Sequence, residues 1–239
     1  MQQFSSSAEH VYQRYLDLAC EGGFEAQQGL GGTLVYAGEL ATSFSLLQAA
    51  NIAGAASLAA SADAALQRQA RREGVVDFLV TSLDEALRIL KNELRKRQPV
   101  SVGVSLEPEA ITGQMLDRGV LPDLLGAVGA DNEFLQQGAR SIPENEAKKG
   151  RYLQWSVDRD FSRWMPLLDD CARSLLPAED AMRQRWLRLA PRYLGRQAQR
   201  VHGVAMDLEE AARFRDAVEQ MLAREVRESA TAPIVSIDA

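Results

Sequence analysis

The chain has 239 residues, of which 46% are hydrophobic and 25% are charged, and its formal net charge at pH 7 is −6. These values are typical of a globular protein that buries a core, and they exclude an intrinsically disordered chain. The acidic balance disfavours binding to nucleic acid through the phosphate backbone. No apolar run reaches the roughly 18 residues that a membrane-spanning helix needs.

The N-terminus and the few cysteines and histidines bear on location and metal binding. The first residues contain neither the basic nor the apolar segment of a signal peptide, so we expect none. Cys20 and Cys171 are too few for a disulfide framework, which favours the reducing cytoplasm, and we expect both thiols to be buried. His10 and His202 are expected at the surface or at helix ends, and two imidazoles exclude a histidine-rich metal site.

Strand patterns and helix patterns alternate between residues 31 and 130. Strands are predicted at residues 33–36, 55–59 (an ambiguous alanine run), 75–80, 100–106 and 124–125. Helices are predicted between them at residues 44–52, 63–72, 82–97 and from Pro108 to just before Gly119. Strands that alternate with helices form a parallel sheet that is covered on both faces. The sequence therefore predicts an α/β fold with a Rossmann-like parallel sheet over residues 30–130.

The helix predicted at residues 82–97 has the best-defined ends. Ser82 can accept a hydrogen bond from the amide of Glu85, and Glu85 can accept one from the amide of Ser82, as in a capping box. Its apolar stripe consists of leucines at helical spacing: Leu83, Leu87, Leu90 and Leu94. Pro99 follows the basic last turn and ends the helix.

The rest of the chain is predicted to be less regular. Residues 1–29 are expected to form an N-terminal helical segment, and residues 131–150 a loop or linker. Residues 151–239 have a helical pattern, with a cap at Asp207–Glu210 and an edge strand or frayed end at residues 233–237. Apolar side chains recur there at helical spacing, as Phe161, Trp164, Leu168, Cys171 and Leu175. These helices must pack on the sheet or on a second subunit, and we expect a homodimer.

Several motifs in the first half resemble the urocanase (urocanate hydratase) family. Residues 30–38, Leu-Gly-Gly-Thr-Leu-Val-Tyr-Ala-Gly, are similar to the start of its nucleotide-binding domain, and residues 53–57 to its next segment. Val76–Asp77 and residues 81–87 resemble the family's Val-Asp and Thr-Asp-Leu-Asp-Asp-Ala-Leu, at the same spacing. Arg118–Asp123 resembles its Arg-Gly-Val-Arg-Pro-Asp. The likeness covers about residues 10–125, whereas a urocanase is more than twice as long as this chain.

The resemblance implies a Rossmann-like domain that binds NAD⁺, and a dimer. In urocanases the nicotinamide ring takes the imidazole of urocanate as a covalent adduct while water adds. This chain departs from the family after Gly38, where the family has Leu-Gly-Gly-Met-Gly-Gly-Ala-Gln and residues 39–46 here contain no glycine. Such glycines let the backbone approach a pyrophosphate, which Glu39 would repel and Phe44 would crowd. NAD⁺ is therefore implied by the resemblance but disfavoured by the loop, and the cofactor is left unassigned.

Two further departures affect the site. The second strand is not followed by the acidic residue that usually binds the ribose, and the nearest acid is Asp63. After Asp123 the family's polar stretch is replaced by the apolar run at residues 124–130, and its active cysteine has no counterpart here. No catalytic residue is therefore assigned, and no metal is expected.

The turn after the first predicted strand is the candidate ligand site. Gly38, Glu39, Thr42 and Ser43 would lie at the carboxyl end of that strand, and Ser61 would follow the second strand. One interpretation is a pocket for a small molecule, in which Glu39 favours a cationic or hydroxylated group. The alternative is an ordinary turn that Thr42 or Ser43 caps.

An arginine-rich run is the most distinctive charge feature. It contains Arg183, Arg185, Arg188, Arg192, Arg196 and Arg200, with no Asp or Glu from residue 183 to residue 200. The last four would share one face of a continuous helix, although Pro191 interrupts it. One interpretation is an anion-binding site made by these four; the other is ion pairing with the acidic first half or with a second subunit.

These observations leave two main classes of function. The first is a urocanase-like protein without NAD⁺ binding or hydratase activity that binds a small ligand or acts as a regulatory module. The second is an enzyme of the urocanate hydratase type, acting in histidine degradation, that uses NAD⁺ or needs a partner chain. RNA binding by the arginine-rich run is disfavoured by the acidic net charge.

Overall fold

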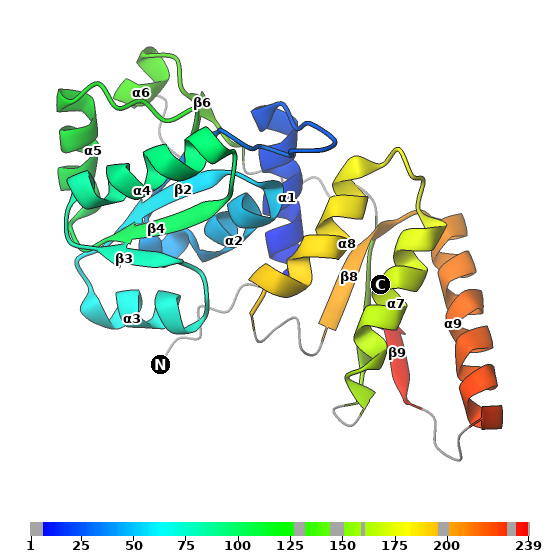
Figure 1. The fold of residues 1–239 in the computed structure, drawn as a ribbon. Helices are drawn as coiled ribbons and strands as arrows, with labels where there is room; N and C mark the ends of the chain where they lie inside the picture. Colours follow the sequence, from blue (N-terminus) through cyan, green and yellow to red (C-terminus); the bar gives the residue numbers. More distant parts are fainter. Residues whose placement is uncertain are drawn as a thin grey trace. The chain divides into compact units, whose positions relative to one another are not determined.

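The structure is a computed structural model, and it describes residues 7–126, 132–143, 151–158, 161–195, 201–228 and 233–238. The chain divides into an N-terminal unit, Met1–Glu146, and a C-terminal unit, Ala147–Ala239 (Figure 1). Each unit has its own sheet and its own buried side chains. In the described part of the chain, no helix is long and apolar enough to cross a membrane.

The N-terminal unit is built on a six-stranded sheet. The strand order is β3-β4-β2-β1-β5-β6, and all neighbouring strands are parallel. The strands are β1 (Leu34–Glu39), β2 (Ala56–Ala60), β3 (Phe78–Val80), β4 (Val100–Val104), β5 (Leu124–Leu125) and β6 (Arg140–Ser141). This arrangement confirms the predicted α/β class and the Rossmann-like parallel sheet.

Helices cover both faces of this sheet (Figure 1). They are α1 (Ala8–Gly22), α2 (Phe44–Ala53), α3 (Ala64–Arg72), α4 (Leu83–Lys96), α5 (Pro108–Asp117) and α6 (Glu133–Gln136). On one face, α4, α5 and α6 pack in a single apolar cluster that includes Leu90, Ile111 and Phe134. On the other face lies α2, with α1 packed against it, and the amide of Asn51 donates to the hydroxyl of Ser101 in β4. Burial of both faces explains why the strands read as continuous apolar runs.

The cap of α4 differs in one detail from the capping box predicted from sequence. Ser82 accepts a hydrogen bond from the amide of Glu85, as expected. The carboxylate of Glu85, however, accepts from the amide and the hydroxyl of Thr81, one residue before Ser82, at 2.9 and 3.1 Å. These bonds from Thr81 are the main reason that the pKa of Glu85 is lowered.

The segment predicted as a loop or linker contributes to the fold. Within residues 131–150, the described part contains α6 and β6, and β6 pairs with β5. Phe134 of α6 is fully buried and contacts the ring of Tyr36, which holds this short helix on the sheet. The expectation of a plain linker is therefore wrong for these residues, because a two-residue strand and a four-residue helix are too short to produce a periodic pattern.

The C-terminal unit contains the expected helices together with strands that were largely not predicted. The helices are α7 (Trp164–Leu175), α8 (Ala181–Tyr193) and α9 (Leu208–Glu228). They accompany an antiparallel sheet of order β8-β7-β9, formed by β7 (Arg151–Val157), β8 (Val201–Met206) and β9 (Val235–Asp238). A helical interpretation of the whole segment is therefore wrong, although the terminal strand expected at residues 233–237 is present as β9.

Aromatic side chains fill the interior of this unit. Trp155 of β7 is fully buried, and its ring lies 4.9 Å from that of Phe214 in α9. Trp186 of α8 is also buried and donates a hydrogen bond to the carbonyl of Gly203 in β8 at 2.7 Å. Trp164 and Leu168 of α7 are buried as well. Within the predicted apolar stripe, Trp164 and Leu168 are therefore covered inside this unit, whereas Phe161, Cys171 and Leu175 are partly exposed.

Candidate functional site

The strand order of the N-terminal unit locates the expected ligand site. In the sheet, β2 lies on one side of β1 and β5 lies on the other. The chain builds β2, β3 and β4 on the first side and then returns to the second, so the direction in which strands are added reverses beside β1. In open parallel sheets, ligands bind outside the carboxyl ends of the strands at such a reversal. Gly38 and Glu39 are the last residues of β1, residues 40–43 follow directly, and Glu39 pairs with Ala60, the residue before Ser61. The structure thus brings together the five residues predicted for this site.

A short 3₁₀ helix, η1 (Leu40–Thr42), fills the position of the glycine-rich loop. Gly38 has a left-handed backbone with φ of +73°, which lets the chain turn at the end of β1. The carboxylate of Glu39 then accepts a hydrogen bond from the amide of Ala41 at 3.1 Å, and the side chain of Leu40 is fully buried. The turn is therefore closed by its own side chains rather than left open for an anion.

The hydroxyl groups of the turn also bond within it. Ser43 is buried, and its hydroxyl lies 2.6 Å from the carbonyl oxygens of both Ala37 and Glu39, which share its single hydrogen. Consequently Ser43 occupies the N-cap position of α2 but makes no side-chain cap bond. The hydroxyl of Thr42 donates to the carbonyl of Glu39 at 3.2 Å. The expectation that Ser43 caps α2 through its side chain is therefore wrong, because its hydroxyl bonds the carbonyls that precede the helix.

Ser61 belongs to a polar cluster that joins the ends of β2 and β4. It is 4% exposed, and its hydroxyl accepts a hydrogen bond from the amide of Asp63. Its carbonyl accepts from the side-chain amide of Gln67, whose carbonyl oxygen accepts from the hydroxyl of Ser105 at 3.0 Å. Asp63 caps α3 by accepting from the amides of Ala65 and Leu66. Asp63, the acid nearest to where a ribose would bind, is therefore already hydrogen-bonded to the backbone of the protein.

Sequence reasoning did not identify Gln67 and Ser105 as neighbours of the site. The available signal was positional: α3 was predicted to begin after β2, so the polar residues in its first turns had to lie near the carboxyl edge of the sheet. Gln67 is in that part of α3, and it links two strand ends that are not consecutive in the chain. Such a bridge depends on the order of strands in the sheet, which the sequence did not supply.

These residues do not fit the pyrophosphate of NAD⁺. The amide of Ala41 bonds to Glu39, and the amide of Ser43 bonds to the carbonyl of Leu40, so neither points outward at an anion. The Glu39 carboxylate lies where a phosphate would need positive potential. On the β5 side, a Cβ at Gly126 would lie 3.2 Å from the Ala37 carbonyl oxygen, so the backbone is already closely packed there.

The arginine-rich run is only partly described by the structure. Arg188 and Arg192 are exposed on α8, and the guanidinium of Arg192 lies 5.4 Å from the ring centroid of Tyr193. Pro191 lies inside the helix, which ends two residues later. Arg196 and Arg200 lie outside the described residues, so the four-arginine anion site stays a prediction.

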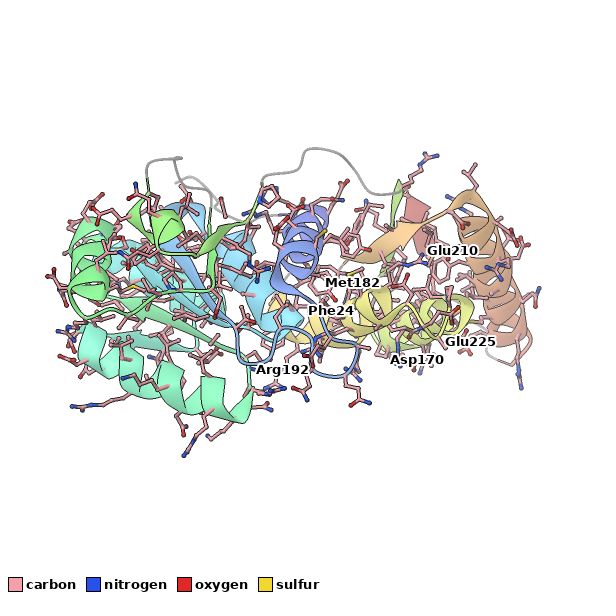
Figure 2. The ribbon with its side chains drawn as sticks, turned by 90° about the horizontal axis from the view of Figure 1, so that it is seen from above. Phe24, Asp170, Met182, Arg192, Glu210 and Glu225 are labelled. Atoms are coloured by element: carbon pink, nitrogen blue, oxygen red, sulfur yellow. The ribbon has the colours of Figure 1, made fainter. Side chains whose placement is uncertain are left out.

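Arg183 instead forms ion pairs within the C-terminal unit. Its guanidinium bonds both carboxylate oxygens of Glu210, at 2.6 and 3.0 Å, and Oδ2 of Asp180 at 2.6 Å. Burial lowers the pKa of Arg183, but the bonds to Glu210 and Asp180 outweigh it, so the pKa is raised overall. Glu210 lies in the first turn of α9 and is labelled in Figure 2. Arg183 does form ion pairs, but the expected partners are wrong, because Asp180 and Glu210 belong to its own C-terminal unit and not to the acidic first half or to a second subunit.

A second buried polar group involves His202, which was expected at the surface or at a helix end. His202 is 7% exposed on β8, and its Nδ1 lies 2.6 Å from Oδ2 of Asp169 in α7. Trp155, the neighbour of His202 across the β7–β8 ladder, donates its Nε1 hydrogen to Oδ1 of Asp169 at 3.1 Å. The expected location of His202 is therefore wrong, because cross-strand pairing carries it into the interior.

The two cysteines also differ from expectation. Cys20 is exposed, so its predicted burial is wrong, whereas Cys171 is half-buried, and burial raises the pKa of its thiol. Neither forms a disulfide. Among the described residues, no group of three or more His, Cys, Asp or Glu side chains is arranged to hold a metal ion.

Comparison with protein families bears on the N-terminal unit alone. The model of the urocanase Rossmann-like domain matches residues 24–132. This segment contains β1 to β5 with the helices between them, and it includes the 3₁₀ turn that replaces the glycine-rich loop. The match confirms the resemblance inferred from the sequence motifs. Over residues 24–132, this chain is similar to the Rossmann-like domain of the urocanase family.

Proposed function

We propose that this chain is a cytoplasmic urocanase-like protein that binds a small ligand or acts as a regulatory module, without NAD⁺ binding or urocanate hydration. The observation that carries the proposal is the 3₁₀ turn after β1. Its inner amides and both of its hydroxyls bond within the turn, where a dinucleotide site needs outward amides. The match to the Rossmann-like domain supports the scaffold, and the altered turn is the reason for proposing a different use of it.

The position of the ligand follows from what remains accessible at the strand reversal. Glu39 is partly exposed and Thr42 is exposed, whereas Ser43 and Ser61 are buried and bonded. A carboxylate and a hydroxyl at this edge favour a cationic or hydroxylated small molecule over a phosphorylated one. Glu39 and Thr42 are therefore the proposed ligand contacts, and Gly38 supplies the turn that presents them.

Thermal unfolding with and without millimolar NAD⁺ tests the loss of cofactor binding. A ligand at about 100 times its Kd stabilises the native state by roughly 2.7 kcal/mol, which moves the transition of a domain this size by several degrees. We expect NAD⁺ to shift none of the unfolding transitions that far-ultraviolet circular dichroism detects. A shift that saturates with NAD⁺ concentration would contradict the proposal and support the hydratase-type alternative. Urocanate absorbance in the near ultraviolet, with an active urocanase as the assay control, would then decide between binding and catalysis.

We also propose a homodimer. Part of the apolar stripe that first suggested it is buried inside the C-terminal unit, so the main support now comes from apolar side chains that are exposed there. They include Leu167, Met182, Val226 and Ile234. Such side chains are common at subunit interfaces. Light scattering over a tenfold dilution series should give the mass of two chains, and the mass of a single chain throughout would refute the dimer.

A further inference from the structure

The C-terminal unit contains a cavity of about 250 Å³ between the start of α9 and the sheet. Leu153 of β7 and Met206 of β8 line it from one face of the sheet, since Met206 pairs with Arg151, two residues before Leu153. Ala211 lines it from the first turns of α9. These three side chains are buried, so the inner wall of the cavity is apolar.

The rim of the cavity combines an exposed apolar group with positive charge. Leu208, the first residue of α9, is 80% exposed beside the opening. Arg151 and Arg215 line the same opening from β7 and from the second turn of α9. A ligand that covered Leu208 and presented a negative group to Arg215 would match both features.

The acidic groups nearby are engaged within the protein. Asp207 lines the cavity, but its Oδ1 accepts a hydrogen bond from the amide of Glu210 at 2.7 Å. Glu210 in turn accepts from the amide of Asp207 and binds the guanidinium of Arg183. Glu210 is therefore paired with a cation away from the cavity, and at the rim two arginines outnumber the single carboxylate of Asp207, which favours an anion.

We propose that this cavity binds a small monocarboxylate with an unbranched apolar chain of about six carbons. The chain would contact Leu153, Met206 and Ala211, and the carboxylate would bond Arg215 at the rim. The size is sufficient, because an apolar cavity of about 150 Å³ already holds benzene in another protein. The planar guanidinium of Arg215 can donate to both oxygens of a carboxylate, which would favour an acid over an alcohol or an amine of the same length. This site is independent of the one proposed in the N-terminal unit.

Three probes of equal chain length test the proposal on the full chain. Hexanoate, 1-hexanol and hexylamine are titrated separately, and binding is followed by the amide resonances of the ¹⁵N-labelled protein. We expect hexanoate to shift amides in residues 151–153 and 206–211, and to bind at least about fivefold more tightly than the other two. No shift there up to about 10 mM would overturn the site. Equal affinity for the alcohol or the amine would overturn charge recognition.

Three substitutions test whether binding occurs in this cavity and whether it depends on Arg215 rather than on charge in general. Arg215→Gln should weaken hexanoate binding at least about fivefold, whereas Arg213→Gln, exposed on the same helix and absent from the cavity wall, should leave it unchanged. Ala211→Met should fill the cavity and abolish binding while the circular dichroism spectrum is retained. Equal effects of Arg215→Gln and Arg213→Gln would overturn the proposal. So would concentration-dependent broadening of these amides without ligand, since a second copy would then occupy the cavity.

Discussion

Arg183→Ala is expected to destabilise the C-terminal unit by about 3–5 kcal/mol, which is the cost of leaving a buried carboxylate without its partner. The side chain of Glu210 is only 7% exposed, and that of Arg183 is 18% exposed, so water screens this pair weakly. The substitution also removes a hydrogen bond from Arg183 to the carbonyl of Ala205 at 3.1 Å. Arg183 therefore joins α8, the end of β8 and the cap of α9.

Urea unfolding followed by tryptophan fluorescence measures this effect selectively. The three tryptophans of the chain, Trp155, Trp164 and Trp186, all lie in the C-terminal unit, so the signal reports on that unit. Arg188→Ala is the matched control, because Arg188 is exposed on the same helix, and it should cost less than about 0.5 kcal/mol. If the free energies of unfolding of the two variants differ by less than about 1 kcal/mol, the ion pair is not a major source of stability.

Asp169→Ala is expected to cost about 2–4 kcal/mol, because two buried groups lose their acceptor at once. A carboxylate only accepts hydrogen bonds, so the Nδ1 of His202 carries the hydrogen in this contact, as Nε1 of Trp155 does. Both donors would remain buried after the substitution. Each unsatisfied buried group costs roughly 1–3 kcal/mol.

The neighbouring aspartate provides the control for this prediction. The side chain of Asp170 is 71% exposed, so Asp170→Ala should change the free energy of unfolding by less than about 0.5 kcal/mol. Asp169→Asn keeps one carbonyl oxygen as an acceptor, and it should retain part of the stability that Asp169→Ala loses. The same fluorescence measurement applies. Asp169→Ala and Asp170→Ala variants of equal stability would show that the Trp155–Asp169–His202 group adds nothing.

Local sequence signals predicted most of the N-terminal unit because its elements depend on nearby residues. The leucine stripe of α4, the proline at the start of α5 and the alternation in β4 each act within one element. Alternation of strands and helices then implies a parallel sheet without further information. The motifs that resemble urocanase fall in this same part of the chain, and the family model matches it.

Two of the C-terminal strands, β7 and β8, were missed because their pairing is distant along the chain. In the ladder of β7 with β8, Arg151 pairs with Met206, and no local pattern links the two strands. Gly203 is required in β8, since a Cβ there would lie 2.6 Å from the carbonyl oxygen of Leu153. In the sequence the same glycine only weakens a short strand pattern. The location of His202 and the walls of the cavity depend on this ladder.

The sequence by itself determined the α/β class, the boundaries of most N-terminal elements and the absence of the glycine-rich loop. Each of these depends on residue types and on spacing within one or two helical turns or strand lengths. Only the tertiary structure decided that Leu40 and Ser43 close the altered turn, that Arg183 binds Glu210, and that the second half has its own sheet. Those features arise from burial and from hydrogen bonds between segments far apart in the chain, which no local pattern specifies.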